Sequence, residues 1–346
     1  MKRRVIKQGH NTFTITLPIK WANKVELKPG SELDVSEQGN SLVIGTSNVA
    51  GDSTIAEIDI TGLPNPLLWR LVSTAYRSGY DEIKINFEGI KNDEERLAEF
   101  SYDITDWFYR GELPRDRLPR LSPIEAIQAL VNRFVGVEII EQKQNYVVIK
   151  QFGEISYKEF DNAIRRIFMI LSSMGKDIVS AIRSDDRVAL KSVHMIDTNI
   201  DRFEDYCLRV LNTKGYADYR KTSTVYSIIF LLEQLGDEYK RIAMHVIEDK
   251  AKYGSNSLKF FDDVNKQFDA FHDLFYTFNL EKVLKVFERD ESFTSTSKKL
   301  YKSANLDEIE LYHHLKKITR LIISLVELAI DLRANMAFEP NEKKKK

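Results

Sequence analysis

The sequence predicts a multidomain protein with a small β-rich head, an α+β middle segment and an all-α body of two three-helix bundles. In about the first 45 residues, short alternating stretches are separated by glycine and proline, which is typical of short strands. From residue 154 almost to the end, long segments place apolar residues at helical spacing. A chain of 346 residues with 43% hydrophobic residues is long enough for more than one core.

The head, residues 1–47, is predicted to contain four short strands and one short helix. Residues 12–17 alternate between polar and apolar side chains, and Pro18 ends this strand. The other elements are a strand opening at Val5, a helix at 19–25, a turn at 28–30, and strands at 32–35 and 41–44. Strands this short bury little surface alone, so we expect a second copy of the chain to complete the core.

The head is also basic. Seven basic side chains and one acidic side chain lie within the first 28 residues, although the whole chain carries a net charge of −1. The remainder is therefore acidic. This asymmetry predicts that only the head approaches a polyanion.

Leu17-Pro18, Trp21 and Leu27-Lys28-Pro29-Gly30 resemble the AbrB-type (SpoVT/AbrB-like) swapped-hairpin domain. The resemblance covers about the first 45 residues and implies a homodimer formed by interleaved hairpins. It also implies DNA contacts, mostly to phosphates, by Arg3, Arg4, Lys7, His10, Lys20 and Lys24. Two alternatives stay open: the bases only keep the domain soluble, or the head serves as a dimerisation or toxin-binding module.

After a Gly/Asn/Ser-containing linker at about 47–53, residues 52–152 are predicted to form the α+β segment. It has no glycine-rich phosphate loop, no nucleophile elbow and no metal-ligand spacing, so we expect a spacer or a sensing surface. A helical region broken by Pro114 and Pro119 is expected in its middle. The other expected elements are strands at 55–60 and 82–87, helices at 66–78 and 123–134, and a hairpin of 136–141 and 146–150.

The body divides into two repeats, residues 154–252 and 258–338, followed by a disordered tail at 339–346. Cys207 falls on a predicted helix and is expected in the core; a single cysteine excludes an internal disulfide framework. A polar loop is expected at 216–222. The six predicted helices are 157–184, 186–211, 225–252, 258–278, 281–301 and 306–334.

Two pairs of acids at helical spacing indicate a site in the first repeat. Glu233 interrupts an apolar stripe, and Asp237 follows it by one turn on the same face. Asp197 and Asp201 repeat this spacing upstream. If the two helices pack together, four carboxylates converge, which hard cations tolerate; in the alternative, the acids are simply solvated. Gly236 leaves room for an ion or a close helix.

The stretch that begins at Glu233 and reads Glu-Gln-Leu-Gly-Asp-Glu-Tyr-Lys-Arg-Ile-Ala is similar to the signature of the PhoU family. The resemblance covers about residues 154–338 and implies two three-helix repeats with an acid-x-x-x-acid motif. It implies a metal ion in the first repeat, with iron, zinc or magnesium as candidates, held by Asp197, Asp201, Glu233 and Asp237. Together with the head, the chain resembles archaeal PhoU-like phosphate uptake regulators.

The second repeat has lost the acid pair. When the repeats are overlaid, Lys316 and Arg320 take the places of Glu233 and Asp237. Asp290 takes the place of Asp197, and Thr294 that of Asp201. We therefore expect no metal in the second repeat, and we expect Lys316 and Arg320 to form salt bridges around Asp290.

We expect a DNA-binding regulator of phosphate uptake, whose body relays phosphate or metal status and which is not an enzyme. The alternative is an adaptor that docks on a phosphate transporter or a sensor kinase without binding DNA. A di-iron oxidase would use Glu310-x-x-His313 and Asp269-x-x-His272, but the partner acids that it needs lie in the other repeat. No signal peptide or membrane span is apparent, so the expected location is the cytoplasm.

Overall fold

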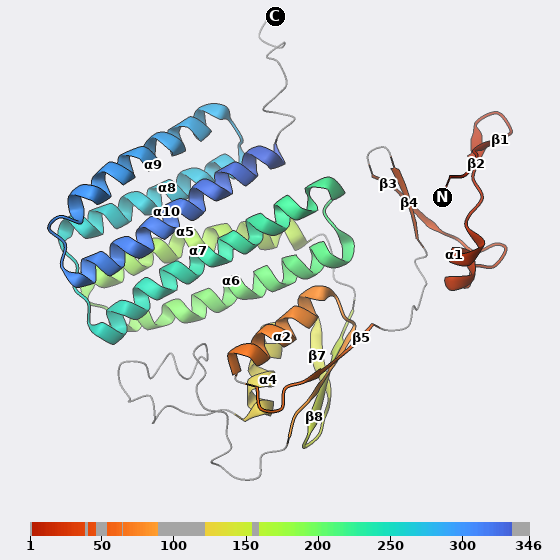
Figure 1. Ribbon diagram of the computed structural model, residues 1–346, viewed down its shortest axis with the longest axis horizontal. Coiled ribbons are helices and arrows are strands. Elements are labelled where there is room, and N and C mark those ends of the chain that lie inside the picture. The colour runs from red at the N-terminus through yellow and green to blue at the C-terminus, as the bar shows by residue number, and fades with distance from the viewer. Residues whose placement is uncertain are drawn as a thin grey trace, which may run out of the picture. The chain divides into compact units, whose positions relative to one another are not determined.

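The computed structural model describes residues 2–38, 41–45, 54–63, 65–88, 122–153 and 159–333. The chain forms two compact units, Met1–Thr54 and Ile55–Lys346. Figure 1 shows the small β-rich unit, the α+β segment and the helical body, as the sequence predicts. The expected linker at 47–53, the expected helical region around Pro114 and Pro119, and the expected tail at 339–346 lie outside the described residues.

The first unit contains two antiparallel hairpins and a short helix. The strand predicted at 12–17 is shorter, because its partner begins at Ile6, which pairs with Thr14. The hairpins are not hydrogen-bonded to each other within the described residues. The elements are β1 (Ile6–Gln8), β2 (Thr12–Thr14), α1 (Ile19–Lys24), β3 (Asp34–Gln38) and β4 (Ser41–Gly45).

No described side chain of the first unit is buried. The apolar side chains are instead exposed; Phe13 is 68% exposed and Ile19 is 70% exposed. Burying apolar surface is the main favourable term in folding, and this unit alone buries little of it. The described part of this unit therefore has no hydrophobic core of its own.

The second unit begins with a four-stranded sheet in the order β5-β6-β8-β7, in which only the β5–β6 pair is parallel. The helix between β5 and β6 makes the crossover that parallel strands require. Side chains of α2 and α4 pack with Ile83, Ile85 and Ile149 in a separate core. The elements are β5 (Ile55–Asp59), α2 (Asn65–Ser78), β6 (Glu82–Asn86), α4 (Pro123–Val131), β7 (Val137–Gln142) and β8 (Tyr146–Gln151).

Six long helices form the body, and their apolar faces share one continuous core. Cys207 is fully buried in it, as predicted. Asn305 and Glu308 form a capping box that starts the last helix. The helices are α5 (Phe160–Ser184), α6 (Arg187–Lys214), α7 (Thr222–Asp249), α8 (Ser255–Tyr276), α9 (Leu280–Leu300) and α10 (Leu306–Leu332). None of these described helices is long and apolar enough to span a membrane.

The α+β segment packs against the body. Arg209 of α6 is fully buried and donates hydrogen bonds to the carbonyl oxygens of Tyr76 and Tyr80 and to the side chain of Gln151. A buried guanidinium needs such partners, because leaving its donors unpaired would cost free energy. This contact fixes α2 and β8 to α6, so the segment is part of the second unit and is not a detached spacer.

Candidate functional site

The candidate site begins with a row of acids along α6. Asp197, Asp201, Glu204 and Asp205 follow one another at helical spacing and therefore share one face. Asp197, Glu204 and Asp205 are 2%, 5% and 1% exposed, respectively. So many buried acids require either protonation or positive partners.

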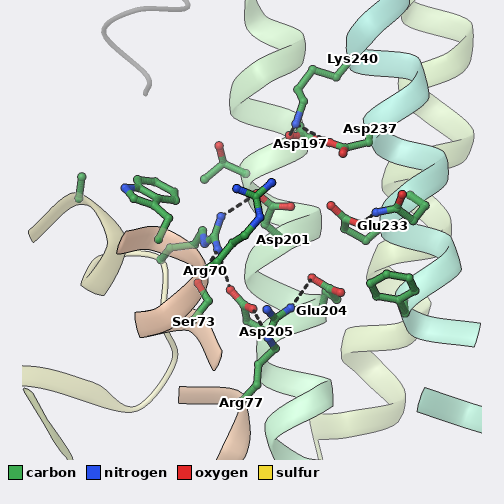
Figure 2. A pocket seen from close by; sticks show the side chains of 16 residues that line it. Arg70, Ser73, Arg77, Asp197, Asp201, Glu204, Asp205, Glu233, Asp237 and Lys240 are labelled. Carbon is green, nitrogen blue, oxygen red and sulfur yellow. Dashed lines mark hydrogen bonds and ion pairs between the residues drawn. The ribbon is translucent and has the colours of Figure 1, made fainter. Parts of the chain in front are cut away.

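The facing helix α7 contributes Glu233, Asp237 and Lys240. Gly236 allows this close packing, since a Cβ atom there would lie 3.0 Å from Ile200 Cδ1 and 3.3 Å from Leu171 Cδ2. The predicted convergence of Asp197, Asp201, Glu233 and Asp237 is thus present: all four line one cavity of about 260 Å³ (Figure 2).

The positive partners come from α7 itself and from the α+β segment. Lys240 Nζ lies 2.5 Å from Asp197 Oδ2 and 2.6 Å from Asp237 Oδ1. Arg133, just after α4, lies 2.8 Å from Asp201 Oδ2 and 2.9 Å from Asp205 Oδ2. Its guanidinium also lies over the Trp69 ring, 5.1 Å from the centroid. These contacts tie both helices and the α+β segment to the row of acids.

Two arginines of α2 complete the wall of the cavity. Arg77 lies 3.8 Å from Glu204 Oε2 and 3.7 Å from Asp205 Oδ1, and Arg70 also lines the cavity. Figure 2 shows these side chains reaching from α2 towards the acids. The lining then contains six acids and four bases, so it keeps negative charge in excess if every group ionises.

That excess is reflected in the protonation of Glu233 and Glu204. Burial, together with the charges of Asp237 and Asp201, raises the pKa of Glu233 to about 8. Burial and the nearby Glu233 raise the pKa of Glu204 well above its usual range. Glu204 Oε1 is buried without a hydrogen-bond partner among the described residues. Glu233 therefore favours its protonated form near neutral pH.

In the ion pair of Asp197 and Lys240, burial and the partner's charge shift each pKa in opposite directions. Burial raises the pKa of Asp197, while the Lys240 ammonium acts in the opposite direction. The pKa of Lys240 is raised because the charges of Asp197 and Asp237 outweigh its burial. A lysine held charged in this way occupies the position between two carboxylates that a cation would otherwise take.

A metal ion does not fit this arrangement as it stands. Metal ligands must be free and deprotonated, yet Asp197 and Asp237 contact Lys240, and Asp201 contacts Arg133. Among the described residues, no group of three His, Cys, Asp or Glu side chains is placed to hold a metal ion. The sequence therefore locates the cavity, and metal binding by Asp197, Asp201, Glu233 and Asp237 stays a prediction.

Sequence reasoning missed Glu204, Asp205 and the basic partners. Glu204 and Asp205 continue the spacing of Asp197 and Asp201, so extending the acidic stripe by one turn would have found them. Lys240 lies three residues after Asp237, where an intrahelical pair is expected. No local pattern indicates Arg133, because it meets Asp201 across 68 residues of sequence.

The residues that a di-iron oxidase would use either make other contacts or are exposed. His272 stacks on Phe168 with ring centroids 4.8 Å apart, and Asp269 lies 2.8 Å from Lys176. His313 is exposed on α10. The buried histidine is its neighbour His314, which lies 2.7 Å from Glu238.

In the first unit, the candidate DNA contacts are all accessible. Lys7 lies on β1 and His10 in the turn after it, while Lys20 and Lys24 lie one turn apart on α1. All six residues are exposed: Arg3, Arg4, Lys7, His10, Lys20 and Lys24. Among the described residues they make no ion pair with an acid of the chain.

Comparisons with known proteins address the two units separately. Residues 6–48 match a family model described as antidote-toxin recognition MazE, bacterial antitoxin. This match agrees with the expectation of an AbrB-type head. A search of curated proteins found no match.

Two similar solved structures are PhoU proteins, the family that the body was expected to resemble. The PhoU structure from Pseudomonas aeruginosa has 21% sequence identity and a TM-score of 0.44, and the match covers 51% of this chain and 97% of that one. The phosphate transport system regulatory protein PhoU from Streptococcus pneumoniae has 14% identity and a TM-score of 0.41, with 53% and 99% covered.

Proposed function

We propose that this protein is a homodimeric, DNA-binding regulator of phosphate uptake. The head dimerises and holds DNA, and the helical body relays phosphate status to it. The observation that carries the proposal is the coreless, basic first unit, within which residues 6–48 match a MazE-type antitoxin model.

Dimerisation is supported by the exposed apolar surface of the head. Phe13, Ile15 and Ile19 are each more than half exposed, and the two hairpins do not pair with each other. A second copy can cover these side chains and add strands to both hairpins. Two copies would also double the number of basic groups presented to one duplex, which strengthens phosphate contacts.

DNA binding is supported by six exposed basic side chains that have no acidic partner in the described part of the chain. Each phosphate contact releases counterions, so the logarithm of the affinity should fall with the logarithm of the salt concentration, with a slope of about −0.9 per contact. Lys20 and Lys24 share one face of α1 and contribute together.

The link to phosphate rests on the sequence of α7 and on the duplicated helical body. The stretch from Glu233 resembles the PhoU signature, and α6 and α7 of the first repeat correspond to α9 and α10 of the second. A ligand of the body can change DNA affinity only through a difference in its own affinity for two body conformations.

An adaptor remains the second candidate, because the matching family model is described by toxin recognition. In this reading the head only binds a protein partner, and the body docks on a phosphate transporter or a sensor kinase. The exposed apolar side chains of the head would then form a protein interface.

A salt titration separates the two functions. Binding of the full chain to its own upstream DNA should be tighter than binding to a scrambled duplex, and it should weaken steeply with salt. Changing Lys20 and Lys24 to Gln should reduce the salt slope by about 2 for one head, whereas Lys285→Gln on α9 should not change it. A wild-type protein without sequence preference and without a salt slope would favour the adaptor.

A further inference from the structure

The second repeat has its own cavity at the place that corresponds to the acidic cavity of the first. It lies between α9 and α10 and has a volume of about 150 Å³. Its polar lining residues occur at the same spacings as those of the first cavity, as the sequence shows. On α9, Asp290, Thr294, Ser297 and Lys298 stand where α6 has Asp197, Asp201, Glu204 and Asp205; on α10, Lys316 and Arg320 stand where α7 has Glu233 and Asp237.

The charge of this cavity is reversed. Lys298, Lys316 and Arg320 line it together with a single carboxylate, that of Asp290. The first cavity has six acids and four bases. The corresponding pair of helices in the second repeat therefore also encloses a cavity, but the lining of this cavity is mainly basic instead of mainly acidic.

The three bases make no short polar contact with the described residues. Within the described residues, the side chains of Lys298, Lys316 and Arg320 make no hydrogen bond and no ion pair shorter than 4.0 Å. The salt bridges expected around Asp290 are absent there, although the Arg320 charge lowers the pKa of Asp290 against the effect of its burial. By contrast, Lys240 and Arg133 in the first cavity each contact two carboxylates.

Hydroxyl groups complete the lining. Thr294 and Tyr301 have hydroxyls without hydrogen bonds in the described part of the chain. Thr319 and Ser297 donate to backbone oxygens of the preceding turn, Lys316 O and Thr294 O. Hydroxyls rotate and can donate to a second acceptor instead. Together with the bases they form a set of donors with few acceptors, which favours an oxyanion.

From this arrangement we infer that the second repeat holds a binding site for a small tetrahedral oxyanion, inorganic phosphate being the member of that class tested first. Lys316 and Arg320 from α10 and Lys298 from α9 supply the charge, and Thr294 and Tyr301 supply neutral hydrogen bonds. A volume of about 150 Å³ suits a small ligand, since pockets for drug-sized molecules begin at roughly 300 Å³.

Asp290 is the single carboxylate of the lining. Burial raises its pKa, while the Arg320 charge acts in the opposite direction, and an anion beside it would raise the pKa further. A phosphate site here would supply the sensor that the proposed function needs, and its regulatory meaning rests on that proposal.

The site is tested by calorimetric titration of the full chain with inorganic phosphate at low salt. Wild type should bind one phosphate per chain with a saturable isotherm. The double change Lys316→Gln and Arg320→Gln should weaken binding at least about tenfold, because charge-assisted hydrogen bonds are lost. The matched control is Lys299→Gln, which removes one positive charge from the exposed surface next to Lys298 without touching the cavity, and it should leave the affinity within about twofold.

Both substituted residues are exposed and make no hydrogen bond or ion pair among the described residues, so the double variant should keep the wild-type helical circular dichroism and melting temperature. Sulfate should compete with phosphate, and chloride at equal ionic strength should not. The site is refuted if wild type shows no saturable binding, or if the double variant binds as tightly as wild type. Phosphate binding without any DNA binding would support the site and refute the proposed regulator. DNA binding without phosphate binding would refute the site alone.

Discussion

At the scale of single residues, Lys240 is the positive partner of two acids of the first cavity, Asp197 and Asp237. Its ammonium lies within 2.6 Å of both Asp197 and Asp237, and the whole side chain is 9% exposed. Lys240→Met should lower the free energy of unfolding by about 3–5 kcal/mol, because it leaves the buried Asp197 carboxylate without its ion-pair partner. Chemical denaturation measures this, with Lys266→Met as the control: Lys266 pairs with Asp263 on an exposed face and should matter by less than about 1 kcal/mol.

Adding Asp197→Asn to the Lys240 variant should recover part of the loss, since the buried charge is then removed together with its partner. If Lys240→Met left the free energy of unfolding nearly unchanged, the ion pairs of Lys240 could not be what stabilises the buried carboxylates. The same variants test the predicted metal site. Should Lys240→Met gain bound zinc or iron on elemental analysis while wild type carries none, the lysine takes the place of a metal in this chain.

Glu233 gives the protein a distinctive pH dependence. Its pKa is about 8 in the folded protein, against about 4.5 normally. Between these values the folded state binds more protons than the unfolded state, so stability falls as pH rises, by up to about 1.4 kcal/mol per pH unit from this group. Glu233→Gln should therefore flatten the stability profile between pH 5 and 8 and stabilise the protein most at the alkaline end.

Denaturant titrations at pH 5, 6.5 and 8 provide the comparison. Glu288→Gln changes an exposed carboxyl on α9 and should reproduce the wild-type profile. A Glu233→Gln profile parallel to that of wild type would show that Glu233 ionises without cost and is not held in its protonated form.

At the scale of secondary-structure elements, Gly175 sets the distance between α5 and its neighbours α7 and α8. A Cβ atom there would lie 2.5 Å from Asn265 Oδ1 and 2.8 Å from Tyr239 Oη. These two groups are hydrogen-bonded to each other, and Asn265 also donates to Gly175 O. Gly175→Ala should destabilise the protein by about 1–3 kcal/mol despite the better helix propensity of alanine.

Thermal unfolding measures this effect. Ser180→Ala on the exposed side of α5 is the control and should change stability by less than about 0.5 kcal/mol. A Gly175→Ala protein as stable as wild type would mean that the buried Tyr239–Asn265 pair can move aside without losing its hydrogen bonds.

The sequence predicts these elements well because periodicity is a local property. All six body helices are present, and their observed ends lie within a few residues of the predicted ones, for instance Leu306–Leu332 against 306–334. Docking of the α+β segment could not be predicted, since it depends on the buried Arg209 and on Arg133, whose partners are distant in sequence. The convergence of the four acids on one cavity could be predicted because it follows from local helical spacing, whereas the contact of Arg133 with Asp201 spans 68 residues and could not.

At the scale of the whole molecule, the missing core of the head predicts a dimer. Phe13 is 68% exposed on β2, and Phe13→Asp should place a charge in the shared core and shift the protein to monomer in sedimentation velocity. Leu284→Asp is the control, since Leu284 is 59% exposed on α9 of the helical body. A wild-type monomer, or a Phe13→Asp variant as dimeric as wild type, would contradict head-to-head assembly.

The two cavities of the body differ in charge although their helices correspond. The basic cavity of the second repeat is the proposed anion site, whereas in the first repeat Arg77 and Arg133 hold the α+β segment on the acids. The proposed regulator therefore requires that ligand binding to the body change the DNA affinity of the head. This change is a coupling free energy between two distant sites.

The most direct test is the affinity of the full-length protein for its own upstream DNA, measured by fluorescence anisotropy with and without inorganic phosphate at constant ionic strength. The account predicts salt-dependent binding whose dissociation constant changes at least about fivefold with phosphate, as expected for a coupling of about 1 kcal/mol or more. Identical binding curves with and without phosphate, or no binding to DNA at any salt concentration, would contradict it.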